Sequence, residues 1–287
     1  MSSSKAKPTT NPDFGEWSQA EVFRFTSQPR LEGAPLLVGW SKDTGAVSRI
    51  TADHWIAASN AGAFCQIEPA GFYSLGGVTV ADDVARFPQS RFFYSPQNHI
   101  AILRADEPQF NRYEFLDAVL DLAQQYGKME ALYTVNGIAA LTPHTTTRRV
   151  FGVFNDAAMQ KRLRQFVPAD MNWQGPPHVS TYLLWLAGQR HLRGAGLWVE
   201  VPFYLAGHED FQSAKAAVSL LAMMLGRDLD LRELDRLVAD QNEKLALLED
   251  DPETEEKIRA LEEDESLNRQ EQLALIEAVD SALKGSA

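Results

Sequence analysis

Short apolar runs alternate with longer amphipathic stretches over most of this 287-residue chain. The runs at Ala34–Trp40 and Asn98–Ala105 have the length and composition of strands that are covered on both faces. Helical spacing of apolar residues at Glu114–Gly127 leads into further strand-like runs at Ala131–Gly137 and Val150–Asn155. Strands that alternate with helices predict an α/β sheet with helices on both faces, and long crossovers predict mostly parallel strands.

The same alternation continues on both sides of this central part. Upstream, a helix over about 44–61 and two short strands, "AFCQIE" and "GFYSL", are expected, with Pro69 between the strands. Downstream, His178–His191 reads as a helix that begins after Gly175 and two prolines, "GLWVEVPFYL" reads as a strand, and Asp210–Gly226 reads as a helix. No internal repeat interrupts the pattern.

The C-terminal part is acidic and helical. The formal net charge of the chain is −12, and residues 227–287 contain 8 Lys/Arg against 19 Asp/Glu, so nearly all the excess lies there. This balance argues against a nucleic-acid partner, which needs a basic face. Leucines from Leu231 onward follow a near-heptad spacing that Gln241 interrupts. Asp251–Pro252 and the pair Asn268 and Glu271 are start signals for two more helices.

These features divide the chain into three parts. We expect a flexible N-terminal arm at 1–18, an α/β/α domain at 19–228 and an acidic helical segment at 229–287. The arm has neither the apolar core of a signal peptide nor a myristoylation glycine, and no run is long enough to cross a membrane. The single cysteine, Cys65, suits a reducing compartment and a buried apolar role. We therefore expect a cytoplasmic protein without a membrane partner.

Polar side chains follow several of the predicted strands. In an open α/β sheet, ligands bind beyond the carboxyl ends of the strands, so residues in these connections should meet at one edge. The pocket candidates are Lys42, Asp43, Glu107, Asn136, His144 and Arg148. Known catalytic and cofactor motifs are absent: there is no P-loop, dinucleotide fingerprint or nucleophile elbow. The six histidines have no metal-ligand spacing, so we expect no catalytic residue, metal or cofactor.

The connection "ALTPHTTTRR" is the most conspicuous of these segments. His144 lies among threonines and before two arginines, and Glu107 or Asp43 could orient it for acid–base work. Arg148 and Arg149 could hold a carboxylate or phosphate. The alternative is a turn shaped by Pro143, in which the histidine and the threonines bind backbone groups. The residues alone leave both interpretations open.

Several stretches in order resemble a known family. They are "GWSKDTGAV", "ADEP", "LTPHTTTRRVFGVFND", "GPPHVSTYLLWLAGQRHLRGAGLWVEVPFYLAG" and "LDLRELDRLVADQNEKL". In this order, over about 35–265, the chain resembles the PAC-two (PAC2) family, the proteasome assembly chaperone family of second-subunit type. The resemblance implies a three-layer α/β/α sandwich of phosphorylase/hydrolase-like fold. It also implies homo-oligomers and, in some relatives, binding to proteasome α-subunits. Other relatives carry ligase labels that this sequence does not support.

Three positions depart from the family pattern. In the family loop Pro-His-Thr-Arg-Pro, Thr146 and Thr147 intervene here before Arg148, and Phe203 stands where many members have a second histidine. The chain ends in "LKGSA", without the hydrophobic-Tyr-X tail of members that dock into the proteasome. Docking through such a tail is therefore not expected.

We expect a non-enzymatic, assembly-chaperone-like protein that acts through protein–protein contacts as a homo-oligomer. Proteasome subunits or another protein are the expected further partners. The contact surface would use the helix around Met223 and Met224 or the C-terminal helices. One alternative is an enzyme or small-molecule-binding protein that uses the strand ends around His144. Another is a scaffold whose acidic helices recruit a basic partner.

Overall fold

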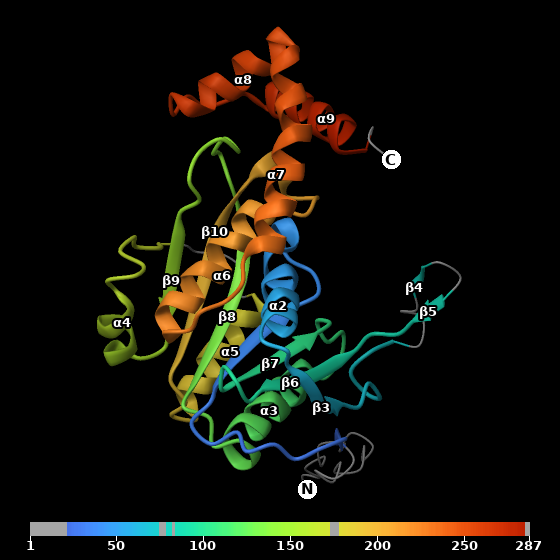
Figure 1. The fold of residues 1–287 in the computed structure, drawn as a ribbon, viewed down its shortest axis with the longest axis vertical. Helices are drawn as coiled ribbons and strands as arrows, with labels where there is room; N and C mark the ends of the chain where they lie inside the picture. The colour runs from blue at the N-terminus through green and yellow to red at the C-terminus, as the bar shows by residue number, and fades with distance from the viewer. Residues whose placement is uncertain (1–21, 75–78, 82–83, 173–177, 285–287) are drawn as a thin grey trace, which may run out of the picture.

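An eight-stranded sheet forms the centre of the molecule (Figure 1). The computed structural model describes residues 22–74, 79–81, 84–172 and 178–284, so the expected arm at 1–18 and the segment around Gly175 lie outside the described residues. The strand order is β1-β3-β6-β7-β2-β8-β10-β9, and a separate hairpin pairs β4 with β5. The strands are β1 (Phe23–Phe25), β2 (Pro35–Trp40), β3 (Gly62–Ile67), β4 (Thr79–Ala81), β5 (Val84–Arg86), β6 (Ser90–Ser95), β7 (Ile100–Ala105), β8 (Ala131–Ala140), β9 (Val150–Phe154) and β10 (Gly194–Pro202).

The sheet is mixed, whereas the sequence predicted a mostly parallel one. Only the four central strands, β7, β2, β8 and β10, are parallel neighbours. The outer strands β1, β3, β6 and β9 pair with their neighbouring strands in the antiparallel direction. Strand β6 ends at Ser95 and β7 begins at Ile100, and a connection this short permits an antiparallel hairpin but no crossover. The sequence pattern does not predict β6, so it does not predict the antiparallel pairing of β6 with β3 and β7.

The expected strand "GFYSL" is a turn in the structure. Gly71 has φ 82°, a left-handed conformation that glycine adopts without steric cost. Backbone N–H groups of Phe72 and Tyr73 donate to the carbonyl of Pro69 and close the turn. The ring of Phe72 then packs edge-on against Phe115, 5.2 Å between centroids. A short apolar run can anchor a loop in the core as well as form a strand.

Helices cover both faces of the sheet. One buried cluster joins α2 (Val47–Ala58), α6 (Phe211–Leu225) and α4 (Ala157–Leu163) to one face, with alternate residues of β10 such as Leu197 pointing into it. The opposite cluster contains α3 (Arg112–Asp121), which continues as the π-helical segment η2 (Leu122–Tyr126), and α5 (Val179–Gln189). The central strands are buried on both sides, which is why they read as unbroken apolar runs.

The chain finishes in three helices beyond the carboxyl ends of β8 and β10 (Figure 1). They are α7 (Arg232–Ala246), α8 (Pro252–Glu262) and α9 (Arg269–Lys284), with the 3-10 turn η4 (Leu247–Asp250) between the first two. Asp251 caps α8 by accepting from the N–H of Thr254. Asn268 and Glu271 form the expected reciprocal capping box: each side chain accepts from the other's backbone N–H.

No helix within 22–74, 84–172 or 178–284 is long and apolar enough to cross a membrane.

Cys65 is buried in β3, and desolvation raises the pKa of its thiol to about 12. The thiol therefore stays protonated and unreactive at neutral pH.

Candidate functional site

The carboxyl ends of the four parallel strands lie along one edge of the sheet, which we call the strand-end rim. Strand β2 pairs in parallel with both β7 and β8, and β10 pairs in parallel with β8. The loops after these strands are therefore spatial neighbours. The six residues predicted from the sequence lie on β8 or in the loops that follow β2, β7 and β8. The contacts of each decide whether they make one site.

Asp43 joins the β2 loop to β8. Its carboxylate accepts the backbone N–H of Gly137 at 2.8 Å and that of Ser48 at 3.0 and 3.1 Å. Strand β2 pairs with β8 only as far as Thr134, so the carboxylate continues the cross-link beyond the point where the strands separate. Burial raises the pKa of Asp43 to about 6, although these two N–H groups favour the charged form.

The turn around Asp43 requires glycine at two places. A Cβ at Gly137 would lie 2.0 Å from the carbonyl oxygen of Thr44, so only glycine lets the loop approach β8 this closely. Gly45 has φ 68° in η1 (Thr44–Ala46), the 3-10 turn that leads into α2. At the start of α2, where an anionic ligand often binds, the protein's own Asp43 carboxylate takes up the N–H of Ser48.

Lys42 and Glu107 stand apart from this arrangement. Lys42 is exposed. Glu107 forms an ion pair with Arg112 across 3.7 Å at the start of α3, and both side chains are partly exposed. Exposed pairs of this kind contribute about 0–1 kcal/mol. We find no contact between Glu107 and His144, so the expected carboxylate–histidine pair is not formed by these two residues.

Asn136 belongs to a buried network on the α5 face of the sheet. The indole N–H of Trp40 donates to the Ser180 hydroxyl at 2.9 Å, and that hydroxyl donates to Asn136 Oδ1 at 2.8 Å. Ser180 lies in the first turn of α5, so the network joins β2, β8 and the start of this helix. The Nδ2 group of Asn136 is buried without a hydrogen-bond partner. The network serves packing between the helix and the sheet.

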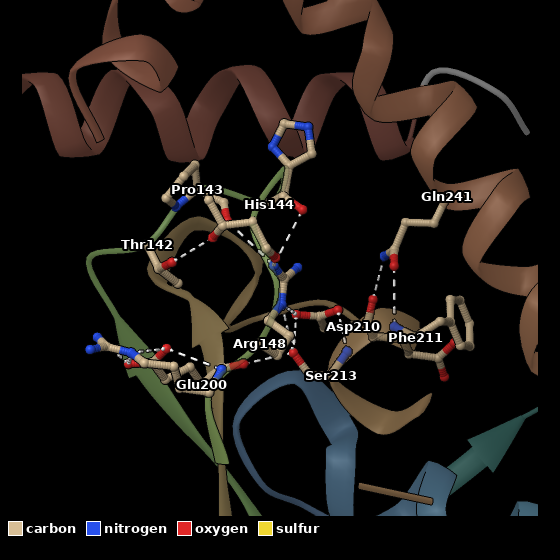
Figure 2. Close-up of polar contacts among 12 residues, drawn as sticks. Thr142, Pro143, His144, Arg148, Glu200, Asp210, Phe211, Ser213 and Gln241 are labelled. Atoms are coloured by element: carbon tan, nitrogen blue, oxygen red, sulfur yellow. Dashed lines mark hydrogen bonds and ion pairs between the residues drawn. The ribbon is translucent and has the colours of Figure 1, made fainter. Parts of the chain in front are cut away.

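Arg148 lies buried at the centre of the loop that follows β8 (Figure 2). Its Nε donates to the Ser213 hydroxyl at 3.0 Å and to the Asp210 carboxylate at 3.4 Å. Its Nη1 donates to three carbonyl oxygens of its own loop, at 2.9–3.3 Å, those of Pro143, His144 and Thr146. The guanidinium thus folds the loop around itself and ties it to the start of α6. These contacts leave the guanidinium enclosed by protein, so it is not an open anion site.

His144 is held by Tyr204 from the 3-10 turn η3 (Phe203–Leu205) after β10. The Tyr204 hydroxyl accepts the backbone N–H of His144 at 2.6 Å and lies 2.9 Å from its Nδ1. Burial, followed by the Arg148 cation, lowers the pKa of His144. Burial also raises the pKa of Tyr204, so the neutral phenol donates to a neutral imidazole. Figure 2 shows the imidazole directed toward the C-terminal helices, away from the guanidinium.

Four residues of this cluster were not singled out from the sequence: Tyr204, Asp210, Ser213 and Glu200. Asp210 caps α6 by accepting from the N–H of Ser213, and an acidic residue three positions before a serine at a helix start is a recognisable signal. Glu200 is buried on β10 and forms a 2.7 Å ion pair with Arg149. Its role could not be foreseen, because the pairing of β9 with β10 places the two residues side by side.

The C-terminal helices close over this part of the rim. Glu262 of α8 accepts from the Thr145 hydroxyl at 2.5 Å, and Asp280 of α9 lies 2.5 Å from His208. Gln241 of α7 donates to the carbonyl of Glu209 and accepts from the N–H of Phe211 at the start of α6. These contacts join the three C-terminal helices to the loops at the carboxyl ends of the strands, the edge at which ligands bind in open α/β sheets.

One cavity lies at the rim and another lies farther along β9, and none of the six predicted residues lines either of them. The first, about 240 Å³, is lined by Ile138–Ala140, Phe151, Asp170–Asn172 and Glu200. The second, about 410 Å³, runs along β9 and is lined by Gly152–Ala157, Gln160, Arg164, Asp170 and Met171. Within the described part of the chain, no three His, Cys, Asp or Glu side chains are placed to hold a metal ion. The six residues therefore do not share either of these cavities; Arg148 and His144 are joined through the His144 carbonyl, and Asp43, Asn136 and Glu107 bind other parts of the chain.

The family assignment comes from a match to a family model. The model of the PAC2 family matches residues 36–249, about three quarters of the chain. The chain belongs to the PAC2 family. The matched range runs from the second residue of β2 through β10 to α7, and it includes the contacts of Asp43, Asn136, His144 and Arg148. Glu262 of α8 and Asp280 of α9, which contact the rim, lie beyond it. No curated protein matches this PAC2 chain.

Solved structures share the PAC2 fold at low sequence identity. A Mycobacterium tuberculosis protein of unknown function is 19% identical with a TM-score of 0.75, covering 91% of this chain and 93% of its own. An archaeal proteasome activator from Pyrococcus furiosus is 19% identical with a TM-score of 0.65, covering 79% and 98%. A proteasome-assembly chaperone homologue of M. tuberculosis is 17% identical with a TM-score of 0.65, covering 74% and 94%.

The PAC2 loop motif gains a structural role from this geometry. Pro143, His144 and Thr145 form the tip of the loop that Arg148 and Tyr204 hold. Thr146 and Thr147, the extra residues of this chain, lie between the tip and Arg148, and the carbonyl of Thr146 becomes one of the guanidinium's acceptors. In this PAC2 protein the motif therefore shapes a turn beneath α8 and α9.

Proposed function

We propose that this PAC2 protein acts through protein–protein contacts, as an assembly-chaperone-like homo-oligomer, and not as an enzyme. The supporting observation is that the polar groups of the rim are bonded within the chain: Asp43 accepts from backbone N–H groups, His144 bonds to Tyr204, and Arg148 donates to Ser213. The printed names of two structural neighbours, a proteasome-assembly chaperone homologue and a proteasome activator, agree with such a role. Proteasome subunits are accordingly the first partners to test.

Within this proposal, the two parts of the chain have different tasks. The α/β/α domain predicted at 19–228 carries the family fold in this proposal, and the acidic helical segment predicted at 229–287 covers the rim. The buried single cysteine supports a role in the cytoplasm. The arm at 1–18 is assigned no task.

The surface proposed for self-association lies on α6 and the C-terminal helices. Met223 on α6 is 61% exposed, and Leu273 on α9 is 52% exposed. Exposed apolar side chains of this size commonly mark protein contacts when they cluster. Both helices contact α7, and Met223 and Leu273 are tested separately as parts of the proposed surface.

Light scattering on the purified chain tests the self-association. We expect a mass that is a multiple of the 32.0 kDa of one chain, and we expect Met223→Glu to reduce it. Phe87→Glu is the matched control, because Phe87 is similarly exposed, at 58%, but lies next to the β4–β5 hairpin. A monomer at micromolar concentration contradicts the proposal.

Mixing the chain with purified proteasome α-subunits tests the partner. Co-elution of the two, lost in Met223→Glu or Leu273→Glu, supports an assembly role. A thermal-shift screen with nucleotides, amino acids and phosphorylated metabolites tests the alternative that the protein binds a small molecule. Stabilisation by a metabolite that disappears in His144→Ala would favour the small-molecule alternative.

A further inference from the structure

A cavity of about 240 Å³ lies over the carboxyl-terminal part of β8, and we call it the Glu200 pocket. Ile138 of β8 and Glu200 of β10 are direct neighbours in the parallel ladder, and both line this cavity. Alternate residues of a strand share a face, so Ile138 lies on the same face as Asn136, whose side chain contacts Ser180 of α5. The Glu200 pocket is therefore on the α5 face of the sheet.

Among the lining residues that the structure describes, only Glu200 is both charged and buried. Its side chain is 5% exposed, and the walls around it are mainly apolar, with Ile138, Phe151 and Met171 among them. A carboxylate in such surroundings is unfavourable unless a cation accompanies it. Because little water competes for it there, Glu200 attracts a cation more strongly than a carboxylate on the open surface does.

The cation that pairs with Glu200 is Arg149, which does not itself line the pocket. Its Nη2 lies 2.7 Å from one carboxylate oxygen, and its Nε lies 2.9 and 3.0 Å from the two oxygens. The side chain of Arg149 is 70% exposed, so its guanidinium is largely hydrated even while it is paired. A hydrated partner is held weakly. Another cation that keeps Glu200 neutralised can therefore take its place, and Arg149 then returns to water.

The rest of the lining brings no positive charge into the Glu200 pocket. None of its described lining residues is Lys, Arg or His, and the other polar side chains are Asp170 and Asn172. Asp170 is 71% exposed and pairs with Arg164, which lines the neighbouring cavity instead. An exposed carboxylate of this kind adds little attraction. The preference of the pocket for a cation therefore rests on the buried Glu200.

The position of Arg149 shows which kind of cation these residues accommodate. Its guanidinium carbon lies 6.0 Å from the centroid of the Phe151 ring while its nitrogens contact Glu200. A planar guanidinium binds a carboxylate through two nitrogens and also packs on an aromatic ring. Phe151 and Glu200 both line the pocket, so a guanidinium inside it meets the same two groups. The cavity is far larger than the ~30 Å³ that one water molecule occupies, which leaves room for a side chain.

We propose that the Glu200 pocket binds an arginine side chain of a partner protein, whose guanidinium takes the place of Arg149 on Glu200. The methylene stem of the incoming arginine lies against the apolar walls, at Ile138, Phe151 and Met171. This inference rests on the proposed function only in taking a protein as the partner. Arg149 is then an internal competitor, which neutralises Glu200 when no partner is bound.

Isothermal titration calorimetry of the full chain with synthetic peptides tests the ligand. The probe is the blocked peptide Gly-Ser-Arg-Ser-Gly, and its control has citrulline, which keeps the shape of arginine without the charge. We expect saturable binding of the arginine peptide, at least tenfold tighter than that of the citrulline peptide. Free arginine is another source of the same group and should bind no tighter than the peptide. Free arginine that binds at least tenfold tighter would overturn the assignment to a partner protein.

Substitutions in the protein locate the binding, with circular dichroism to check that each variant folds. Glu200→Gln removes the charge and should weaken binding of the arginine peptide at least tenfold. Glu262→Gln makes the same change on α8, outside the pocket, and should bind normally. Ala140→Phe fills the pocket and should also weaken binding at least tenfold. Arg149→Gln removes the internal competitor and should tighten binding at least threefold, a gain that a merely structural Glu200–Arg149 pair would not give.

Discrimination against citrulline, with weaker binding in Glu200→Gln and tighter binding in Arg149→Gln, supports the inference. No binding of the arginine peptide at 5 mM, equal binding of the two peptides, or an affinity that Arg149→Gln fails to raise overturns it. Light scattering on the same sample, without peptide, reports the oligomer separately. An oligomeric chain that does not bind the arginine peptide would therefore refute this pocket and leave the proposed function standing.

Discussion

The guanidinium of Arg148 supplies hydrogen bonds that the loop after β8 cannot make by itself. Three loop carbonyls point at one side chain, which also joins the loop to Asp210 and Ser213 of α6. A lysine could not replace it. The donors of arginine are spread over a planar group, whereas lysine has one compact ammonium group that cannot reach both the loop carbonyls and the start of α6. The arginine is buried, and its Nε and Nη1 groups both donate to acceptors within the chain.

Replacing Arg148 with Met should lower the free energy of unfolding by about 3–5 kcal/mol, because it leaves the buried carboxylate of Asp210 without its cation. Urea unfolding measures the change. Arg30→Met is the control: that side chain is 89% exposed, and its loss should alter stability by less than about 0.5 kcal/mol. Adding Asp210→Asn to Arg148→Met should restore part of the loss. A change below about 1 kcal/mol in Arg148→Met would contradict the role we assign.

Asp43 should make the stability of the protein depend on pH. Its pKa is raised to about 6 in the folded state, above the ordinary 3.8, so the folded chain binds more protons between these values. Stability therefore falls as pH rises from about 4 through 6, by about 3 kcal/mol at most for this group. Urea unfolding of the wild type and of Asp43→Asn at pH 4 and pH 7 measures how much of the pH dependence of the free energy of unfolding is due to Asp43. Two parallel pH profiles would show that Asp43 does not titrate in this range.

The helical elements explain an irregularity of the sequence. Gln241 interrupts the near-heptad pattern of α7, at a position where an apolar residue would complete the stripe. In the structure it is buried and binds Glu209 and Phe211 at the start of α6. The first turn of a helix has unpaired N–H groups, and here a neighbouring helix provides the acceptor. The break in the pattern is the contact that joins α7 to α6.

Gln241→Leu should therefore destabilise the protein even though it completes the apolar stripe. Two backbone groups would lose their partners in a partly buried position, at a cost of about 1 kcal/mol. Thermal unfolding followed by circular dichroism measures this. Glu243→Leu, on the exposed face of the same helix, is the control and should change stability little. A Gln241→Leu protein more stable than the wild type would refute the assignment.

Over the whole molecule, burial decided what could be read from the sequence. The strands β2, β7, β8 and β10 are covered on both faces, so their apolar runs predicted them well. Strand β6 mixes apolar with polar residues at the edge of the parallel part, so its pattern does not predict a strand, and the apolar run at Gly71–Phe72 wrongly predicts one. The start signals of α8 and α9 were read correctly because they depend only on neighbouring residues.

The candidate site was harder to foresee for a related reason. His144 contacts Tyr204 across 60 positions of sequence, and Arg148 contacts Asp210 across 62. Polar residues after parallel strands do lie along one edge, as the topology requires, but the pattern cannot tell whether they face a cavity or each other. Tertiary pairing decided this, and it gave Asp43, Asn136, His144 and Arg148 different partners elsewhere in the chain.

Removing Asp251–Ala287 should leave the sheet folded and loosen the rim beneath the lost helices. The described part of this segment contributes Glu262 and Asp280, which contact Thr145 and His208. Amides within 143–146 and 203–208 should exchange faster in the truncated chain, while those of β2 and β7 should keep their protection. Hydrogen-exchange mass spectrometry measures both sets. Global loss of protection would show instead that α8 and α9 are integral to the core.

The partners of the loop after β8 also bear on the order in which the chain can fold. When a ribosome has released residues up to Phe154, all the strands of the sheet except β10 exist, yet the anchors of this loop, Tyr204, Asp210 and Ser213, have not been made. Arg148 therefore stays without its Asp210 partner until 62 further residues have been synthesised. The loop should thus be among the last parts of the sheet edge to become ordered, after α6 has docked.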